Sequence, residues 1–265
     1  MVSADMAQSV GQQADIEPQI RDIKPADLKA AFMAGVDDFR VMPTHLVLLV
    51  IIYPILGLVL ARIAFGYDML PLLFPIISGF ALIGPLAAVG LYELSRRRQL
   101  GLEASWRQAF SVFTSPAIKN VLGLGVVQLV IYVAWLVSAQ LIYFATFGSE
   151  FPQSYTGFVF DVLTTSAGWT LIIVGCGVGA VFATLVLSIS AISFPMLLDK
   201  DVSIATAVKT SVRAIKMNPV AMTIWGATVV ALLVLGSIPF FLGLAIVMPI
   251  LGHATWHLYR RIVSY

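Results

Sequence analysis

Charged side chains are scarce in this sequence. Asp, Glu, Lys and Arg make up 11% of the 265 residues, against about 25% in a typical soluble domain. Apolar residues make up 59%, and a soluble fold of this size would have to expose large apolar patches to hold them. The composition therefore predicts an integral membrane protein. A net charge of +2 is too small to indicate a nucleic-acid partner, and we expect none.

Cysteine is scarce as well. The single cysteine, Cys176, excludes an internal disulfide and any metal or iron–sulfur site built from several cysteines. We also expect no cleavable signal peptide, because the acidic N-terminal segment has no basic stretch followed directly by an apolar core. We therefore expect residues 1–23 to be a flexible cytoplasmic tail and residues 24–265 to form the membrane domain.

Long apolar runs dominate what is present. A transmembrane helix needs about 20 predominantly apolar residues, and six segments meet this requirement. The sequence therefore predicts an all-α membrane protein with six spans. They lie at about 43–65, 70–92, 119–146, 168–193, 219–237 and 239–259.

Basic residues predict the orientation of these spans. Every Lys and Arg except Arg62 lies before the first span, between the second and third, between the fourth and fifth, or after the sixth. Lys and Arg concentrate on the cytoplasmic side of membrane proteins. We therefore expect a multi-pass protein of a bacterial inner membrane with both termini in the cytoplasm and membrane lipids as its surroundings.

A threefold repeat accompanies the spans. Segments at about 26–40, 102–114 and 203–216 each carry apolar residues at offsets 0, +4, +8 and +11, which fall on one helical face. Each segment precedes a pair of spans, so we expect three parallel repeats of an interfacial amphipathic helix plus a helical hairpin. The three faces comprise Leu28, Phe32, Val36, Phe39, Leu102, Trp106, Phe110, Phe113, Ile204, Val208, Val212 and Ile215.

Three histidines are candidates for metal or haem ligation. His253 and His257 are four residues apart and share a helix face, and His45 lies at a similar depth in the first span. The metalloprotease pattern HExxH is absent, because Ala254 follows His253. Histidines at a membrane interface also serve as hydrogen-bonding anchors, so the pattern leaves both interpretations open. We expect no bound cofactor.

Other polar and small residues have structural interpretations beside functional ones. Gly175 and Gly179 form a GxxxG pair, which favours close helix packing. Gln128, Gln140 and Ser188 suit hydrogen bonds between helices, or alternatively a polar cavity. The arginine run 96–98 is typical of a stop-transfer anchor, or alternatively of a site for anionic headgroups, and Glu93 lies in position to pair with Arg97.

Four strings carry a family resemblance: MLPLLFPIISGFALIGPLAAVGLYELSRRRQLG (69–101), SFPMLLDKD (193–201), MNPVAM (217–222) and LGHATWHLYRR (251–261). They resemble a bacterial family of integral membrane proteins of unknown function, some of whose members carry a cytochrome c oxidase subunit label. The resemblance covers about residues 30–262 and implies a bacterial inner-membrane location, with no activity to transfer. A catalytic oxidase subunit needs about six histidines for its haems and copper, and this chain has three.

The sequence contains no paired carboxylates, Ser–His–Asp set or nucleophile motif at the spacing of a catalytic site. We therefore expect a non-enzymatic accessory, assembly or scaffolding component of an inner-membrane complex. A respiratory complex is one candidate for that complex. One alternative is a transporter or channel for a small solute. Another is metal or haem handling through the histidines.

Overall fold

The computed structural model describes residues 18–42, 57–58, 70–152, 154–239 and 242–265. The described chain is helical except for a pair of two-residue strands. The expected first span at 43–65, with His45 and Arg62, lies outside the described residues apart from 57–58. Most of the expected tail at 1–23 does so too.

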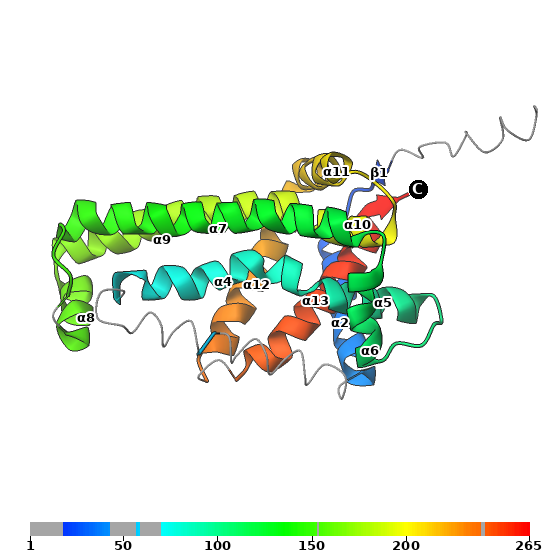
Figure 1. The fold of residues 1–265 in the computed structure, drawn as a ribbon, viewed down its shortest axis with the longest axis horizontal. Helices are drawn as coiled ribbons and strands as arrows, with labels where there is room; N and C mark the ends of the chain where they lie inside the picture. The colour runs from blue at the N-terminus through cyan, green and yellow to red at the C-terminus, as the bar shows by residue number, and fades with distance from the viewer. Residues whose placement is uncertain (1–17, 43–56, 59–69, 153, 240–241) are drawn as a thin grey trace, which may run out of the picture.

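The longest element is a helical hairpin. Helix α7 (Ile118–Phe147) ends at Gly148, where a positive φ of 80° suits a residue without a side chain. Helix α8 (Tyr155–Thr164) follows, and α9 (Ser166–Ser190) begins where the Thr165 side chain accepts a hydrogen bond from the Gly168 amide. Helices α7 and α9 run side by side in opposite directions (Figure 1).

Prolines interrupt the neighbouring apolar helices. The 3-10 helix η1 (Leu70–Leu72) leads into α4 (Leu73–Ala87), which contains Pro85 and gives way at Ala88 to α5 (Val89–Gln99). Helix α9 gives way in the same manner to the short α10 (Ser193–Asp199), which contains Pro195. Proline has no amide hydrogen to donate and disturbs the preceding turn, which explains the break between Ser190 and Ser193, just before Pro195. The break at Ala88 follows Pro85 and is not explained in this way.

Among the described residues, four helical segments are long and apolar enough to cross a membrane: Leu70–Gln99, Ile118–Phe147, Ser166–Asp199 and Pro219–Ser237. The chain is therefore an all-helical membrane protein with several apolar helices. The expected six-span arrangement is not confirmed. Helix α13 (Leu244–Ile262), which covers most of the sixth expected span, is not among the four segments, because two histidines and two arginines occupy its second half.

Helix α13 packs instead against the N-terminal helix α2 (Pro25–Val41). Their backbones approach so closely that a Cβ atom added to Gly35 would lie 2.6 Å from the Ala254 amide nitrogen. Helix α12 (Pro219–Ser237) precedes α13. Strand β1 (Gln19–Ile20) pairs antiparallel with β2 (Val263–Ser264), which brings the start of the described chain to its C-terminus.

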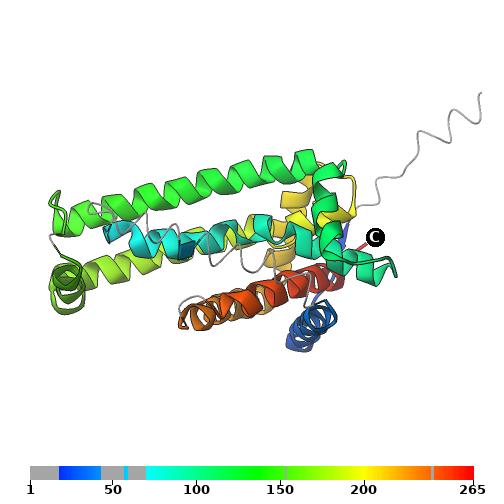
Figure 2. The ribbon, with the colours of Figure 1, turned by 60° about the horizontal axis from the view of Figure 1, so that its bottom comes forward.

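The main buried core gathers at one end of the molecule, which we call the basic end. Most of its residues come from α2, α5, α10, α11 (Ile204–Met217) and the second half of α13, and the starts of α7 and α12 complete it (Figure 1). Phe194, Met196, Trp256 and Leu258 are almost fully buried there. The hairpin of α7 and α9 projects away from this end and exposes many large apolar side chains, as expected for helices that face lipid (Figure 2).

Two of the three expected interfacial segments coincide with single helices, α2 and α11. The segment expected at 102–114 differs, because it contains the short α6 (Trp106–Ala109) followed by the 3-10 helix η2 (Phe110–Thr114). The hydroxyls of Ser111 and Thr114 donate to carbonyls three residues earlier, and such bonds compete with a regular α-helix.

The expected apolar faces are buried to different extents. On α2, Leu28 is buried, whereas Phe32, Val36 and Phe39 are half-buried and the face toward α13 is formed by smaller residues. The four positions on α11 are all half-buried. Along 102–113, the large side chains are exposed: Leu102, Trp106, Phe110 and Phe113.

Candidate functional site

A buried carboxylate lies at the centre of the candidate site. Helix α2 begins at Pro25, in the first helical position that proline favours, and Asp27 accepts a hydrogen bond from the Lys24 amide at 2.9 Å. Its buried face then follows helical spacing through Leu28, Ala31, Gly35 and Asp38. Because this face packs on α13, the Asp38 side chain is only 3% exposed.

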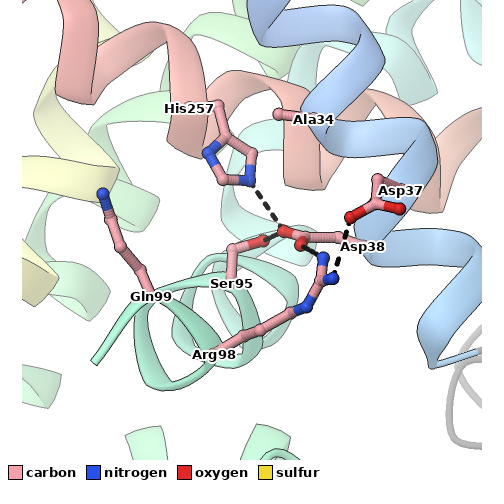
Figure 3. Close-up of a pocket in the computed structure, with 7 residues that line it drawn as sticks. All are labelled: Ala34, Asp37, Asp38, Ser95, Arg98, Gln99 and His257. Atoms are coloured by element: carbon pink, nitrogen blue, oxygen red, sulfur yellow. Dashed lines mark hydrogen bonds and ion pairs between the residues drawn. The ribbon is translucent and has the colours of Figure 1, made fainter. Parts of the chain in front are cut away.

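Three side chains from two other helices donate to Asp38 (Figure 3). Ser95 Oγ of α5 lies 2.5 Å from Asp38 Oδ2, and His257 Nε2 of α13 lies 2.8 Å from the same oxygen. Arg98 of α5 donates to the other oxygen, Oδ1, and also reaches Asp37 Oδ2 at 2.8 Å. One carboxylate thus links α2, α5 and α13, and we call Asp38, Ser95, Arg98 and His257 the Asp38 cluster.

His253 extends the Asp38 cluster into the core. Its Nδ1 lies 2.6 Å from Ser95 Oγ, and the residue is fully buried. Ser95 donates its only hydroxyl proton to Asp38. In the hydrogen bond between Ser95 and His253, the imidazole Nδ1–H is therefore the donor and Ser95 Oγ the acceptor. His253 Nε2 is then an acceptor, and it has no hydrogen-bond partner in the described part of the chain.

These contacts bring together a serine, a histidine and an aspartate, but in an order unlike that of a catalytic triad. In a triad the histidine takes the serine proton and the aspartate orients the histidine. Here the Ser95 proton points to Asp38, and Ser95 is fully buried. The hydroxyl is therefore not activated for attack, and the arrangement acts as a hydrogen-bonded clamp between helices.

The surroundings keep Asp38 ionised. Burial alone would raise its pKa, but hydrogen bonds from His257, Ser95 and Arg98 outweigh burial and lower the pKa from 3.8 to about 2. The positive charge of Arg98 and the donors on both oxygens therefore satisfy a carboxylate that would otherwise be costly to bury.

We expect this pKa shift to make the basic end sensitive to acid. The folded pKa of Asp38 lies below the ordinary value, so its contribution is present above pH 3.8 and is lost as the pH falls through about 2. The shift corresponds to about 2 kcal/mol. Thermal unfolding between pH 5 and pH 2 measures it, and the wild-type protein should lose more stability over this range than Asp38→Asn. Parallel pH profiles of the two proteins would contradict the assignment.

Further ion pairs neutralise the other arginines of α5 and α13. Glu93 pairs with Arg96 at 3.1 Å and with Arg97 at 3.6 Å. The pair with Arg97, four residues away, is the one that the sequence predicts. Asp199 lies 3.0 Å from Arg260 and accepts a hydrogen bond from the Tyr259 hydroxyl at 2.9 Å. The arginines of α5 and α13 thus have carboxylate partners within the chain itself.

An open hollow of about 300 Å³ lies beside the Asp38 cluster, lined in part by Asp37 and Gln99. His257 reaches this hollow, whereas His253 does not line it. The described residues contain no group of three or more His, Cys, Asp or Glu side chains placed to hold a metal ion. His45, the third histidine of the sequence hypothesis, lies outside the described residues.

The other predicted site residues lie along the apolar helices. A Cβ atom on Gly179 would lie 3.1 Å from the Trp135 ring of α7, whereas one on Gly175 would meet no atom within 4 Å. Gln128 is fully buried, and neither of its amide atoms has a partner in the described chain. Ser188 donates to the Thr184 carbonyl of its own helix.

Sequence reasoning missed Asp38 and Ser95. Asp38 belongs to the face of α2 that contains Leu28, Ala31 and Gly35, so it is an acid at the position of a buried residue. An aspartate within a face of small and apolar residues was the available signal. Nothing local marked Ser95, because its partners lie 57 and 158 residues away.

No curated protein and no solved structure matches the chain. A family model does match its middle, from the start of α4 to the end of α10. The matched segment contributes Ser95 and Arg98 to the Asp38 cluster, whereas Asp38 and His257 lie outside it. Residues 73–199 match the family described as predicted integral membrane protein (DUF2189), whose function is unknown, and this match confirms the resemblance seen in the sequence.

Proposed function

We propose that the protein is a non-enzymatic scaffold or assembly component of a bacterial inner membrane, which holds another integral membrane protein against helix α9. The basic end lies in the cytoplasm in this proposal, in keeping with the concentration of Lys and Arg there. The Asp38 cluster then fixes α2, α5 and α13 beneath the spans, and the hairpin of α7 and α9 extends into the bilayer.

The exposure of α9 carries the proposal. Only 6% of its most apolar window is buried, against 28% for α7 and 22% for α12. Ile173 and Val181 are both about two-thirds exposed, and Gly177, which lies between them on the same helix face, has open space beside it in the described structure. Small residues let a neighbouring helix approach closely in lipid, so this face suits contact with a second membrane protein.

Site-specific photocrosslinking in native membranes tests the contact. A photoreactive residue in place of Ile173 or Val181 should yield one discrete protein adduct, because these side chains point away from the rest of the described chain. The same probe in place of Val126 of α7, which is also exposed, serves as the lipid-facing control. Lipid adducts alone at all three positions would contradict the proposal.

A pair of glycine variants separates partner contact from internal packing. Gly177→Leu should leave the fold intact, because its Cβ meets open space, but should reduce the crosslinked adduct at least tenfold. Gly179→Leu should instead lower the melting temperature, because it meets the Trp135 ring. If Gly177→Leu preserves both the adduct and the fold, the α9 face is not the contact surface.

A further inference from the structure

Helix α11 is held crosswise at the basic end. Ser203 caps its first turn by accepting from the Thr206 amide. Its buried face contains Ala207, Ser211 and Ala214, and the Ser211 hydroxyl accepts a hydrogen bond from the Ile192 amide. Helix α11 packs on α9 and α10 but runs across them rather than along them (Figures 1 and 2).

The opposite face of α11 is basic. Lys209, Arg213 and Lys216 follow one another at spacings of four and three residues, and all three are exposed. Together with the half-buried Val208 and Val212 they line an open hollow of about 390 Å³. Helix α11 contains no acidic residue, so the face carries three positive charges beside two apolar side chains.

These three charges differ from the arginines of α5 and α13 at the same end. Arg96, Arg97, Arg98, Arg260 and Arg261 each lie within 4 Å of a carboxylate of the chain. Within the described ranges, Lys209, Arg213 and Lys216 form no such pair. The arginines are thus used internally, whereas the α11 charges remain available to an external anion.

We propose that this face of α11 binds the headgroups of anionic phospholipids. When α7 and α9 span the bilayer, a helix that crosses their ends lies in the plane of the headgroups. Val208 and Val212 can then contact acyl chains, while the three basic side chains reach lipid phosphates. The site extends beyond the scaffold role, because it makes an anionic lipid a specific ligand of the protein and does not need a second protein at the exposed face of α9.

The arrangement of charge favours a lipid surface as the occupant. The basic groups extend over about 10 Å along the helix axis, so they can contact more than one headgroup. Phosphate groups that lie side by side at a membrane surface match such a row, and the adjoining valines match the acyl chains below it. The sequence pattern alone could not separate this basic segment from the arginines of α5, which are already neutralised.

Lipid binding to the purified full-length protein in detergent tests the proposal. Delipidated protein is titrated with phosphatidylglycerol or phosphatidylcholine, and bound lipid is counted by native mass spectrometry. We expect the wild-type protein to prefer phosphatidylglycerol. The variant K209Q/R213Q/K216Q should bind it about 100-fold more weakly, at about fivefold per basic residue, with an unchanged melting temperature, because these side chains are exposed and unpaired.

A variant of equal net charge is the matched control. Lys29, Arg40 and Lys119 are also exposed, and K29Q/R40Q/K119Q should retain binding to within about threefold. An equal loss in both variants would assign the effect to net charge and overturn the site. Equal affinity of the wild-type protein for phosphatidylcholine would also overturn it. So would displacement of the lipid by millimolar inorganic phosphate, which would indicate a site for a free anion.

Discussion

Replacing Asp38 with alanine is expected to destabilise the basic end by about 3–5 kcal/mol, the range for breaking a buried ion pair. The variant leaves Ser95 and His257 without their shared acceptor and removes the buried partner of Arg98. Unsatisfied buried donors each cost about 1–3 kcal/mol. Because the three donors come from two helices, the loss should loosen α2 from both α5 and α13.

The neighbouring residue Asp37 provides a matched control. Asp37 also pairs with Arg98, at 2.8 Å, but its side chain is 63% exposed against 3% for Asp38. Exposed ion pairs contribute about 0–1 kcal/mol, so Asp37→Ala should have little effect. The two variants remove the same chemical group from adjacent positions on one helix, and only burial and the number of donors distinguish them.

Thermal unfolding and limited trypsin digestion measure the difference. Helix α2 contains Lys29 and Arg40, both exposed, and cleavage at either requires local opening of the helix. Asp38→Ala should therefore accelerate cleavage within α2 and lower the melting temperature, whereas Asp37→Ala should do neither. Equal behaviour of the two variants would show that the Asp38 cluster does not hold α2 in place.

Part of this fold could be predicted from the sequence because its signals are local. Apolar runs and the scarcity of charge predict helices in a membrane, and the described part of the chain has four helical segments of that kind. The break of the fourth apolar run just before Pro195 also follows from local chemistry. The role of α13 could not be predicted in the same way. Its apolar first half resembles part of a transmembrane helix, whereas its polar second half is buried against α2.

The Asp38 cluster was beyond local reasoning. Its contacts join residues 57 and 219 positions apart, and no spacing rule relates such positions. The apolar pattern of α2 emphasised Phe32, Val36 and Phe39, because hydrophobic periodicity weighs large side chains. Close helix packing uses small side chains instead, so the contact face contains Ala31 and Gly35, and Asp38 shares that face.

Gly35 should therefore be a second position with a large effect. Gly35→Ala adds one methyl group, and alanine favours an isolated helix over glycine by about 1 kcal/mol. At this site the new Cβ would lie 2.6 Å from the Ala254 amide nitrogen and 2.8 Å from its Cα atom. Backbone atoms within a packed helix cannot move aside as a flexible side chain can, so α2 would have to shift away from α13.

Such a shift would also lengthen the contacts of Asp38, which lies one helical turn beyond Gly35 on the same face. We expect Gly35→Ala to destabilise the protein by about 2–4 kcal/mol. This range begins within the usual cost of overpacking a core and extends somewhat above it. Gly175→Ala, whose added Cβ meets open space in the described structure, is the control and should be neutral or slightly stabilising. Hydrogen exchange should show lost protection across α2 and the second half of α13 in Gly35→Ala only. Retained protection there would mean that the two helices tolerate a wider separation, and that the Asp38 cluster rather than the close backbone contact sets their packing.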